Sequence, residues 1–273
     1  MRRIFVPLHG PDDAGTLLRL AGQLASPFGA QIEAAFIDDS GKLEDETVPD
    51  DAPGVAAARA AFEEWSTAVA ASPAPVQASW REIPDGVVYA SASLGRASDL
   101  IVTRSPRRVA EEDRVLHARR GERSFRDALI ASGRLTLLVP QGQTDAASLL
   151  DHVVLAWDGS AGVARALGQS LALLARARSV RVIIVGRNTV GLRAREAIES
   201  YVRLYSDGAR LLVQENAHRQ TGRALLDAMR GEHTTLVVMG VCGRSHPAGA
   251  PGALGGTILK VIEDGRIPIL TAN

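Results

Sequence analysis

Short runs of apolar residues, many of them β-branched, alternate along the chain with longer segments in which apolar residues recur every three or four positions. The short runs lack polar alternation, which is typical of strands buried on both faces of a parallel sheet. Such strands alternating with helices predict an α/β protein built from βαβ units. The strands are predicted at residues 4–8, 31–37, 76–80, 100–103, 135–139, 153–157, 180–185, 210–214, 236–239 and 267–270.

The helical patterns are clearest in the second half of the chain. Helices are predicted there at residues 161–177, 192–205, 223–230 and 257–264. The first of them has an apolar stripe formed by Ala164, Leu167, Leu171 and Leu174. Ser160 is placed to cap its start, and Gly265 is placed to end the last helix of the chain.

The two halves of the sequence resemble each other. Residues 4–10 align with residues 153–159 at an offset of 149, and residues 100–102 align with residues 236–238. Each aligned pair has the same strand-then-helix pattern, so the sequence predicts two copies of one domain. We expect domains at residues 1–141 and 151–273, joined by a polar linker at residues 142–150.

The first half also contains an acidic insertion at residues 38–53. Its seven carboxylates accompany a single basic residue, Lys42. These carboxylates lack the fixed loop pattern of a calcium-binding hand, so a solvated surface loop is favoured over a metal site.

Composition and charge narrow the classes of function. Lys plus Arg and Asp plus Glu both total 31, so the chain has no formal net charge, and this argues against a mainly electrostatic nucleic-acid binder. The single cysteine, Cys242, excludes an intrachain disulfide framework and favours a reducing cytoplasm. No apolar run approaches the roughly 20 residues of a membrane span.

Candidate chemistry is concentrated where strands of the second half end, since ligands of open parallel sheets bind at the carboxyl ends of the strands. Asp158, Gly159 and Ser160 follow the first of these strands, and the glycine-rich segment 240–257 follows the fourth. Such a segment could cradle phosphates with its backbone amides, or it could be a loop that only needs tight turns. The phosphate-binding loop of P-loop enzymes, the dinucleotide fingerprint and the nucleophile elbow are absent from the sequence.

These residues resemble the universal stress protein family, and the whole chain resembles a tandem member with two such domains. The resemblance rests on Asp158-Gly159-Ser160, the glycine-rich segment and the final strand at residues 267–270. It implies two doubly wound domains, each a five-stranded parallel sheet of order 3-2-1-4-5 with helices on both faces. Its ATP-binding members carry the motif G-x2-G-x9-G-[ST]. The positions that the resemblance assigns to nucleotide binding are Asp158, Val185, Gly240, Gly243, Gly255, Gly256 and Thr257.

The sequence departs from that motif in both halves. Eleven residues instead of nine separate Gly243 from Gly255, and Gly256 stands where Ser or Thr is expected, so that Thr257 would replace it one position later. In the first half, the aligned positions hold His9, Arg104, Arg107, Arg123 and Ser124. Because arginine side chains would fill a site that needs bare backbone, we expect no ATP binding of this kind in the first domain. The arginine-rich segment 104–126 is either a mixed-charge surface or a site for an acidic partner.

The resemblance implies a stress-response regulatory protein that binds an adenine nucleotide, with ATP as the expected cofactor and no magnesium ligands assigned. The alternative is an interaction or scaffold protein in which both sites are degenerate. An enzyme is not favoured, because no base, nucleophile or metal cluster was found, and ATP hydrolysis would at most be slow. The expected partner is the nucleotide, and within the chain the two domains are expected to pair through residues 135–139 and 267–270. Neither nucleic acid nor a membrane is expected as a partner. A homodimer is left open.

Overall fold

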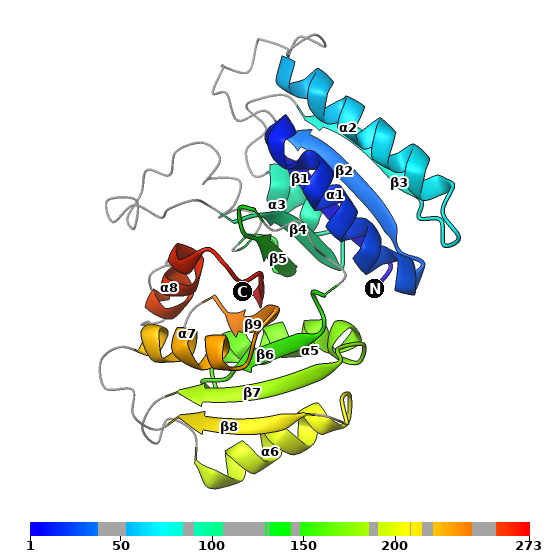
Figure 1. Ribbon diagram of the computed structural model, residues 1–273. Coiled ribbons are helices and arrows are strands. Elements are labelled where there is room, and N and C mark those ends of the chain that lie inside the picture. The colour runs from blue at the N-terminus through cyan, green and yellow to red at the C-terminus, as the bar shows by residue number, and fades with distance from the viewer. Residues whose placement is uncertain are drawn as a thin grey trace. The chain divides into compact units, whose positions relative to one another are not determined.

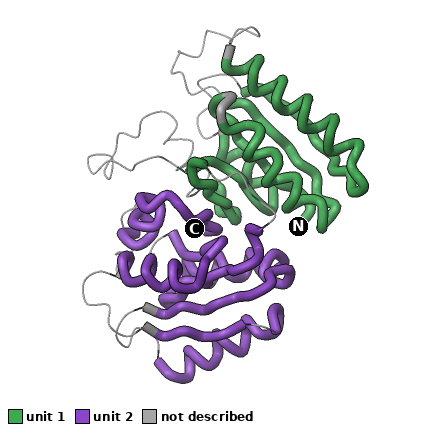
Figure 2. Tube along the Cα trace, in the orientation of Figure 1, with its two compact units in different colours: residues 1–106, 116–146 green, residues 107–115, 147–273 purple. Residues whose placement is uncertain are grey.

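The structure is a computed structural model. It describes residues 1–37, 53–83, 90–105, 129, 131–142, 148–185, 191–207, 209–214, 221–241 and 255–273. The chain divides into two compact units, shown in different colours in Figure 2. Among the described residues, those up to Gly142 belong to unit 1 and those from Ser148 belong to unit 2.

Unit 1 begins with a strand, and helices connect most of its later strands (Figure 1). Its described elements, in chain order, are β1 (Arg3–Leu8), α1 (Pro11–Ala25), the 3-10 helix η1 (Ser26–Phe28), β2 (Gln31–Ile37), α2 (Pro53–Ala70), β3 (Ala78–Ile83), α3 (Ala90–Gly95), β4 (Leu100–Arg104) and β5 (Leu135–Val139). The strands are parallel in the order β3-β2-β1-β4-β5.

Aliphatic and aromatic side chains cover both faces of the unit 1 sheet. On one face, Phe36 packs with Val55 and Ala58 of α2, and Trp80 lies against them. On the other face, Phe5, Ala35, Ile37 and Ile101 form a cluster with Leu94 of α3. Figure 1 shows α1 and α2 together on one side of this sheet and α3 on the other. Strands β1, β2, β4 and β5 are therefore buried on both faces, as their unbroken apolar runs predict, whereas the edge strand β3 is only partly buried.

Unit 2 repeats this plan. Its described elements, in chain order, are β6 (His152–Ala156), α5 (Ala161–Leu174), β7 (Ser179–Val185), α6 (Leu192–Arg203), β8 (Arg210–Gln214), α7 (Thr221–Gly231), β9 (Leu236–Gly240), α8 (Gly256–Asp264) and β10 (Ile269–Ala272). The strands are parallel in the order β10-β9-β6-β7-β8. Helix α5 packs against β9 and β10, while α7 packs against α8 and β7. The predicted α/β class is confirmed.

Two strands, β3 and β10, differ from their predicted ranges by more than one residue at an end, each for a physical reason. Strand β10 begins at Ile269 instead of residue 267, because Pro268 has no N–H group for the ladder and contributes only its carbonyl, to Val237 N–H. Strand β3 continues to Ile83 instead of ending at Trp80. As an edge strand it can carry charged residues, and Arg81 forms an ion pair with Glu33 on the neighbouring strand.

Helix α5 also differs from its prediction. It ends at Leu174, three residues before the predicted end, because the amides of Arg176 and Ala177 bond to carbonyls only three residues back, as in a 3-10 turn. Ala164 was predicted on the apolar stripe but is exposed. The buried face is formed by Gly162, Val163, Ala166, Leu167, Ser170, Leu173 and Leu174. The acidic insertion predicted at residues 38–53 lies almost entirely outside the described residues.

Candidate functional site

Those residues assigned to nucleotide binding that the structure describes lie at or just after the carboxyl ends of the unit 2 strands, or at the start of α8. Asp158 comes shortly after β6, Val185 ends β7, and Gly240 ends β9. Because these strands are parallel and in register, their carboxyl ends lie at one edge of the sheet. Of Val185, only the backbone is described. Gly243 lies outside the described residues.

Asp158 and Ser160 shape the turn that leads from β6 into α5. Gly159, between them, has φ +74°, a left-handed conformation that favours glycine. Asp158 Oδ1 accepts a hydrogen bond from the Ser160 N–H at 2.8 Å, and Ser160 Oγ accepts one from the Val163 N–H at 3.3 Å. Ser160 is the N-cap of α5, which confirms that prediction. Asp158 therefore holds the turn, whatever else it contacts.

Gly240 lies against the first turn of α5. A Cβ atom at this position would be 2.7 Å from Val163 N and 3.0 Å from the Gly162 carbonyl carbon. Both are backbone atoms, so neither can rotate away as a flexible side chain would. Glycine at residue 240 thus allows the end of β9 and the start of α5 to meet.

The start of α8 is hydrogen-bonded to the residue that follows β9. The Gly255 N–H donates to the carbonyl oxygen of Val241, the residue after β9, at 2.9 Å. Gly255 is the N-cap of α8 and contributes no side-chain cap, while a Cβ at Gly256 would meet no atom within 4 Å. Thr257 is half-buried in the first turn. As in any α-helix, the first backbone amides of α8 have no intrahelical acceptor.

The helix ends at this edge favour a negatively charged ligand. Neither α5 nor α8 has an acidic residue in its first turn. The N-terminus of a helix carries a partial positive charge and unsatisfied N–H groups, which bind phosphate and carboxylate groups. Two such helix ends adjoin the end of β9, because Gly240 contacts α5 and Val241 is bonded to the residue that caps α8.

The corresponding edge of unit 1 contains charged side chains. His9 follows β1, and its Nδ1 lies 3.3 Å from the Ile37 carbonyl oxygen. Arg104 ends β4; its guanidinium forms an ion pair with Asp13 and donates to the Pro140 carbonyl oxygen. Arg107, Arg123 and Ser124, the other positions that depart from the motif, lie outside the described residues.

Sequence reasoning missed the partner of Arg104. Asp13 is in the first turn of α1, and its counterpart in unit 2 at the offset of 149 is Gly162. The contrast between an aspartate and a glycine at aligned positions was a signal available in the sequence. This contrast can be interpreted only with the structure, in which Arg104, 91 positions later in the chain, contacts Asp13.

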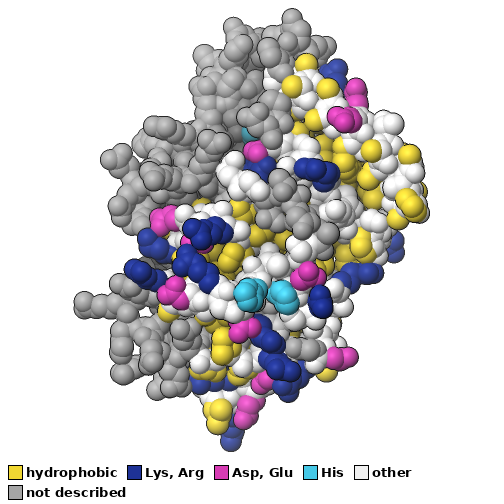
Figure 3. All heavy atoms as spheres, viewed as in Figure 1, with side chains coloured by type: hydrophobic (Ala, Val, Ile, Leu, Met, Phe, Trp, Pro, Cys, Tyr) yellow, Lys and Arg dark blue, Asp and Glu magenta, His cyan; other side chains and the backbone are white. Residues whose placement is uncertain are grey.

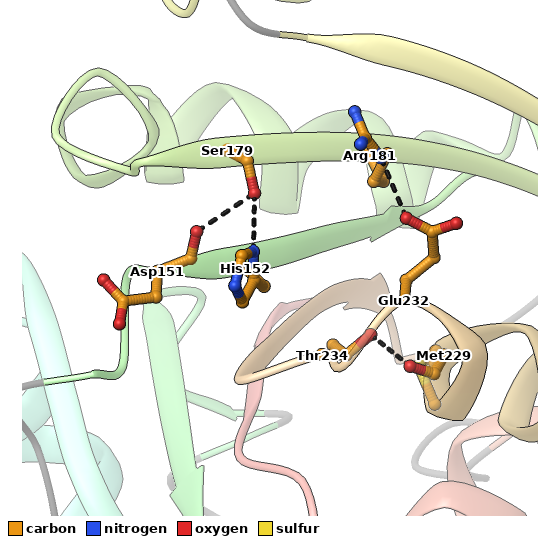
Figure 4. Close-up of polar contacts among 7 residues, drawn as sticks. All are labelled: Asp151, His152, Ser179, Arg181, Met229, Glu232 and Thr234. Atoms are coloured by element: carbon orange, nitrogen blue, oxygen red, sulfur yellow. Dashed lines mark hydrogen bonds and ion pairs between the residues drawn. The ribbon is translucent and has the colours of Figure 1, made fainter.

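A polar cluster at the opposite, amino-terminal edge of the unit 2 sheet has a different character (Figure 4). His152 Nδ1 lies 2.9 Å from Ser179 Oγ, and Ser179 Oγ donates to the Asp151 carbonyl oxygen at 3.0 Å. A hydroxyl has one proton, and with that proton directed to the Asp151 carbonyl oxygen the imidazole is the donor to Ser179. In this arrangement the cluster joins β6 to β7.

In the described part of the chain, no group of three or more His, Cys, Asp or Glu side chains could hold a metal ion. Within the same residues, no helix combines the length and the apolar character needed to cross a bilayer. Cys242 and His246 lie outside the described residues.

Known proteins resemble this chain in structure. No protein-family model and no curated protein matches the sequence. A universal stress protein from Archaeoglobus fulgidus DSM 4304 has a TM-score of 0.74 at 16% identity, with 98% of this chain and 94% of that chain covered. A candidate universal stress protein from Pseudomonas aeruginosa UCBPP-PA14 has a TM-score of 0.64 at 14% identity, with 99% and 92% covered.

A third similar structure is the cytoplasmic domain of a prokaryotic cation chloride cotransporter, with a TM-score of 0.54 at 12% identity and 100% and 95% of the two chains covered. Identities of this size support a statement about fold and none about activity. Together with the strand order and the helices of each unit, these similarities identify the fold: the chain has the fold of the universal stress proteins.

Proposed function

We propose that this protein is a stress-response regulator that binds an adenine nucleotide, ATP in the first instance, at the carboxyl edge of the unit 2 sheet. One observation carries the proposal. The N-termini of α5 and α8, both without acidic residues in the first turn, each adjoin the end of β9. A polyphosphate is the ligand that such paired helix ends suit best.

The remaining contacts follow from the resemblance to universal stress proteins. The backbone of Val185 would hold the adenine, and Asp158 would lie near the adenosine. Gly240, Gly243 and Gly255 would let backbone amides approach the phosphates, with Gly256 and Thr257 at the start of α8. Asp158 already orients the turn before α5, so its proposed contact with the ligand adds to a structural role.

The proposed output is regulatory and not catalytic. None of the described residues at this edge forms a pair of nucleophile and base, and fast turnover needs positioned groups of that kind. ATP bound with little hydrolysis would stabilise one conformation of unit 2, which a partner could then recognise. Turnover of about 1 per second or faster would contradict this part of the proposal.

Gly256 offers a direct test, because a side chain at this position meets no atom within 4 Å. Gly256→Asp places a negative charge in the first turn of α8, and Gly256→Asn is its neutral match in size. We expect isothermal titration with ATP to show at least tenfold weaker binding for the Asp variant than for the Asn variant, a difference of about 1.4 kcal/mol. An acidic residue in the first turn favours the helix, so folding of the Asp variant should be preserved.

The alternative is a scaffold protein that binds no nucleotide. It is favoured by the spacing between Gly243 and Gly255, which is two residues longer than in the ATP-binding motif. The protein purified without added nucleotide should release an adenine nucleotide on denaturation, identified by mass spectrometry. If none is released and titration with ATP shows no binding to the unmodified protein, the scaffold function replaces our proposal.

A further inference from the structure

The edge of unit 1 holds an ion pair where unit 2 has two glycines. Most buried positions of α1 and α5 coincide at the offset of 149, which pairs Asp13 with Gly162. The sheet register pairs Arg104 with Gly240, because Ile4 lies opposite Leu100 as Val153 lies opposite Leu236. The matching buried positions of the helices are Ala14 and Val163, Leu17 and Ala166, Leu18 and Leu167, Ala21 and Ser170, and Leu24 and Leu173.

The Asp13–Arg104 pair and the Gly162–Gly240 pair lie at the same place in the two units. Each joins the end of the fourth strand of its unit to the first turn of the first helix. In unit 1, Arg104 Nη2 lies 2.5 Å from Asp13 Oδ1, and Arg104 Nη1 donates to the Pro140 carbonyl oxygen at 2.7 Å. In unit 2, Gly240 meets the backbone of Gly162 directly. The Arg104 side chain is only 14% exposed, so its charge is held inside the edge and not in solvent.

The ion pair changes what the first helix can bind. Asp13 places a carboxylate in the first turn of α1, where the helix end favours negative charge. Pro11, at the start of the same turn, has no N–H group to offer a ligand. The first turn of α1 therefore already carries a carboxylate of the chain itself, and Arg104 provides its counter-charge.

We propose that the Asp13–Arg104 pair is an internal substitute for a bound anion, and that it closes the edge of unit 1 to phosphate-bearing ligands. The glycines at residues 162 and 240 are the reciprocal choice, which leaves the helix ends of unit 2 open to such a ligand. The residue types at the aligned positions 13/162 and 104/240 then determine which of the two units binds a phosphate-bearing ligand. The part that concerns unit 2 rests on the function proposed above.

A double-variant cycle tests the pair in unit 1 without any ligand. Asp13→Asn leaves a largely buried guanidinium without its carboxylate, so it should lower the melting temperature by about 3 °C. In an Arg104→Met background, the same Asp13→Asn change should lower it by less than about 1 °C, because the cation is gone. Equal losses in the two backgrounds would show that Asp13 and Arg104 are not coupled and would overturn the proposal.

Gly162 tests the reciprocal position. Gly162→Asp should weaken ATP binding by about tenfold or more relative to Gly162→Asn, its neutral match, with both variants checked for folding by thermal unfolding. Equal affinities of the two variants, with normal binding by the unmodified protein, would overturn the inference and leave the proposed function intact. Absence of ATP binding by the unmodified protein would instead remove the proposed function, and the ion-pair cycle would then decide the inference by itself.

Discussion

At the scale of single residues, Gly240 affects both backbone packing and ligand access, because it has no Cβ atom. The missing Cβ allows β9 to approach the first turn of α5, which is also the proposed phosphate site. A side chain at residue 240 must therefore push the helix away before it reaches any ligand.

Gly240→Ala is expected to destabilise unit 2 by about 1–3 kcal/mol, the usual cost of forcing extra atoms into a packed region. The measurement is urea unfolding followed by far-ultraviolet circular dichroism. Gly168→Ala is the matched control: it lies on the exposed face of α5 with no atom within 4 Å of a new Cβ. That variant should be about 0.5–1 kcal/mol more stable than the unmodified protein, because alanine favours a helix. Equal stabilities of the two variants would contradict the packing argument.

Asp99 provides a test that depends on pH. Partial burial raises the pKa of its carboxyl, but hydrogen bonds from the backbone N–H groups of Arg2 and Arg3 outweigh this and hold the pKa below its ordinary value. A carboxyl with a lowered folded-state pKa stabilises the fold above its unfolded-state pKa, and this contribution is lost as the pH falls through the folded-state value.

Asp99→Asn should therefore cost about 1 kcal/mol at neutral pH, after allowance for the exposure of the group. The difference from the unmodified protein should shrink as the pH falls below about 4, where the unmodified carboxyl also becomes protonated. Free energies of unfolding measured from pH 7 down to acid provide the comparison, and Asp207→Asn controls for the loss of one exposed carboxylate. A difference that stays constant over this range would contradict the assigned role.

How far single residues can be predicted from the sequence depends on the range of their interactions. Ser160 as an N-cap and Gly265 as a helix end were predictable, because their contacts are local. The contact between Asp13 and Arg104 was not, because it depends on how the sheet brings α1 and β4 together. Pattern reasoning found the arginine and missed the carboxylate that holds it.

At the scale of elements, the short connection from β6 into α5 positions the proposed site. Ser160→Ala removes the hydroxyl that accepts the Val163 N–H and should cost about 1 kcal/mol of stability. Ser200→Ala is the matched control on α6, where an exposed hydroxyl bonds to the Ala197 carbonyl of its own helix. Its substitution should be neutral or slightly stabilising. Chemical denaturation of both variants gives the comparison, and a Ser160 effect no larger than that of Ser200 would contradict the cap.

Element boundaries show what periodicity omits. The strand and helix types followed from apolar spacing, whereas the end of β3 depended on ion pairs that only an assembled edge can form. The start of β10 depended on the missing N–H of Pro268, a local fact that hydrophobic pattern ignores. For the candidate site, Val185 and Gly240 were placed at strand ends by spacing, while the approach of Gly240 to α5 needed the structure.

At the scale of the whole molecule, the two units share a fold but differ in the chemistry of their edges. Among the described side chains on the face shown in Figure 3, basic and acidic groups are interspersed, in keeping with a formal net charge of zero. A charged ligand is thus not drawn to the protein by a broad field, and local helix ends must supply the attraction. Unit 2 presents such ends without acidic residues in their first turns, and unit 1 has Asp13 in that place.

This difference predicts that ATP protects one unit only. A ligand that binds the folded state stabilises it by about 2.7 kcal/mol at 100 times its Kd. Hydrogen exchange monitored by mass spectrometry should therefore slow in β6, α5 and β9 on addition of ATP, where the amides lie nearest the proposed site. Exchange in β1, β2 and β4 should not change, because α1 already carries its own carboxylate. Slowing in the unit 1 strands that Gly256→Asp does not abolish would place a second site in unit 1, contrary to the role given to Asp13 and Arg104.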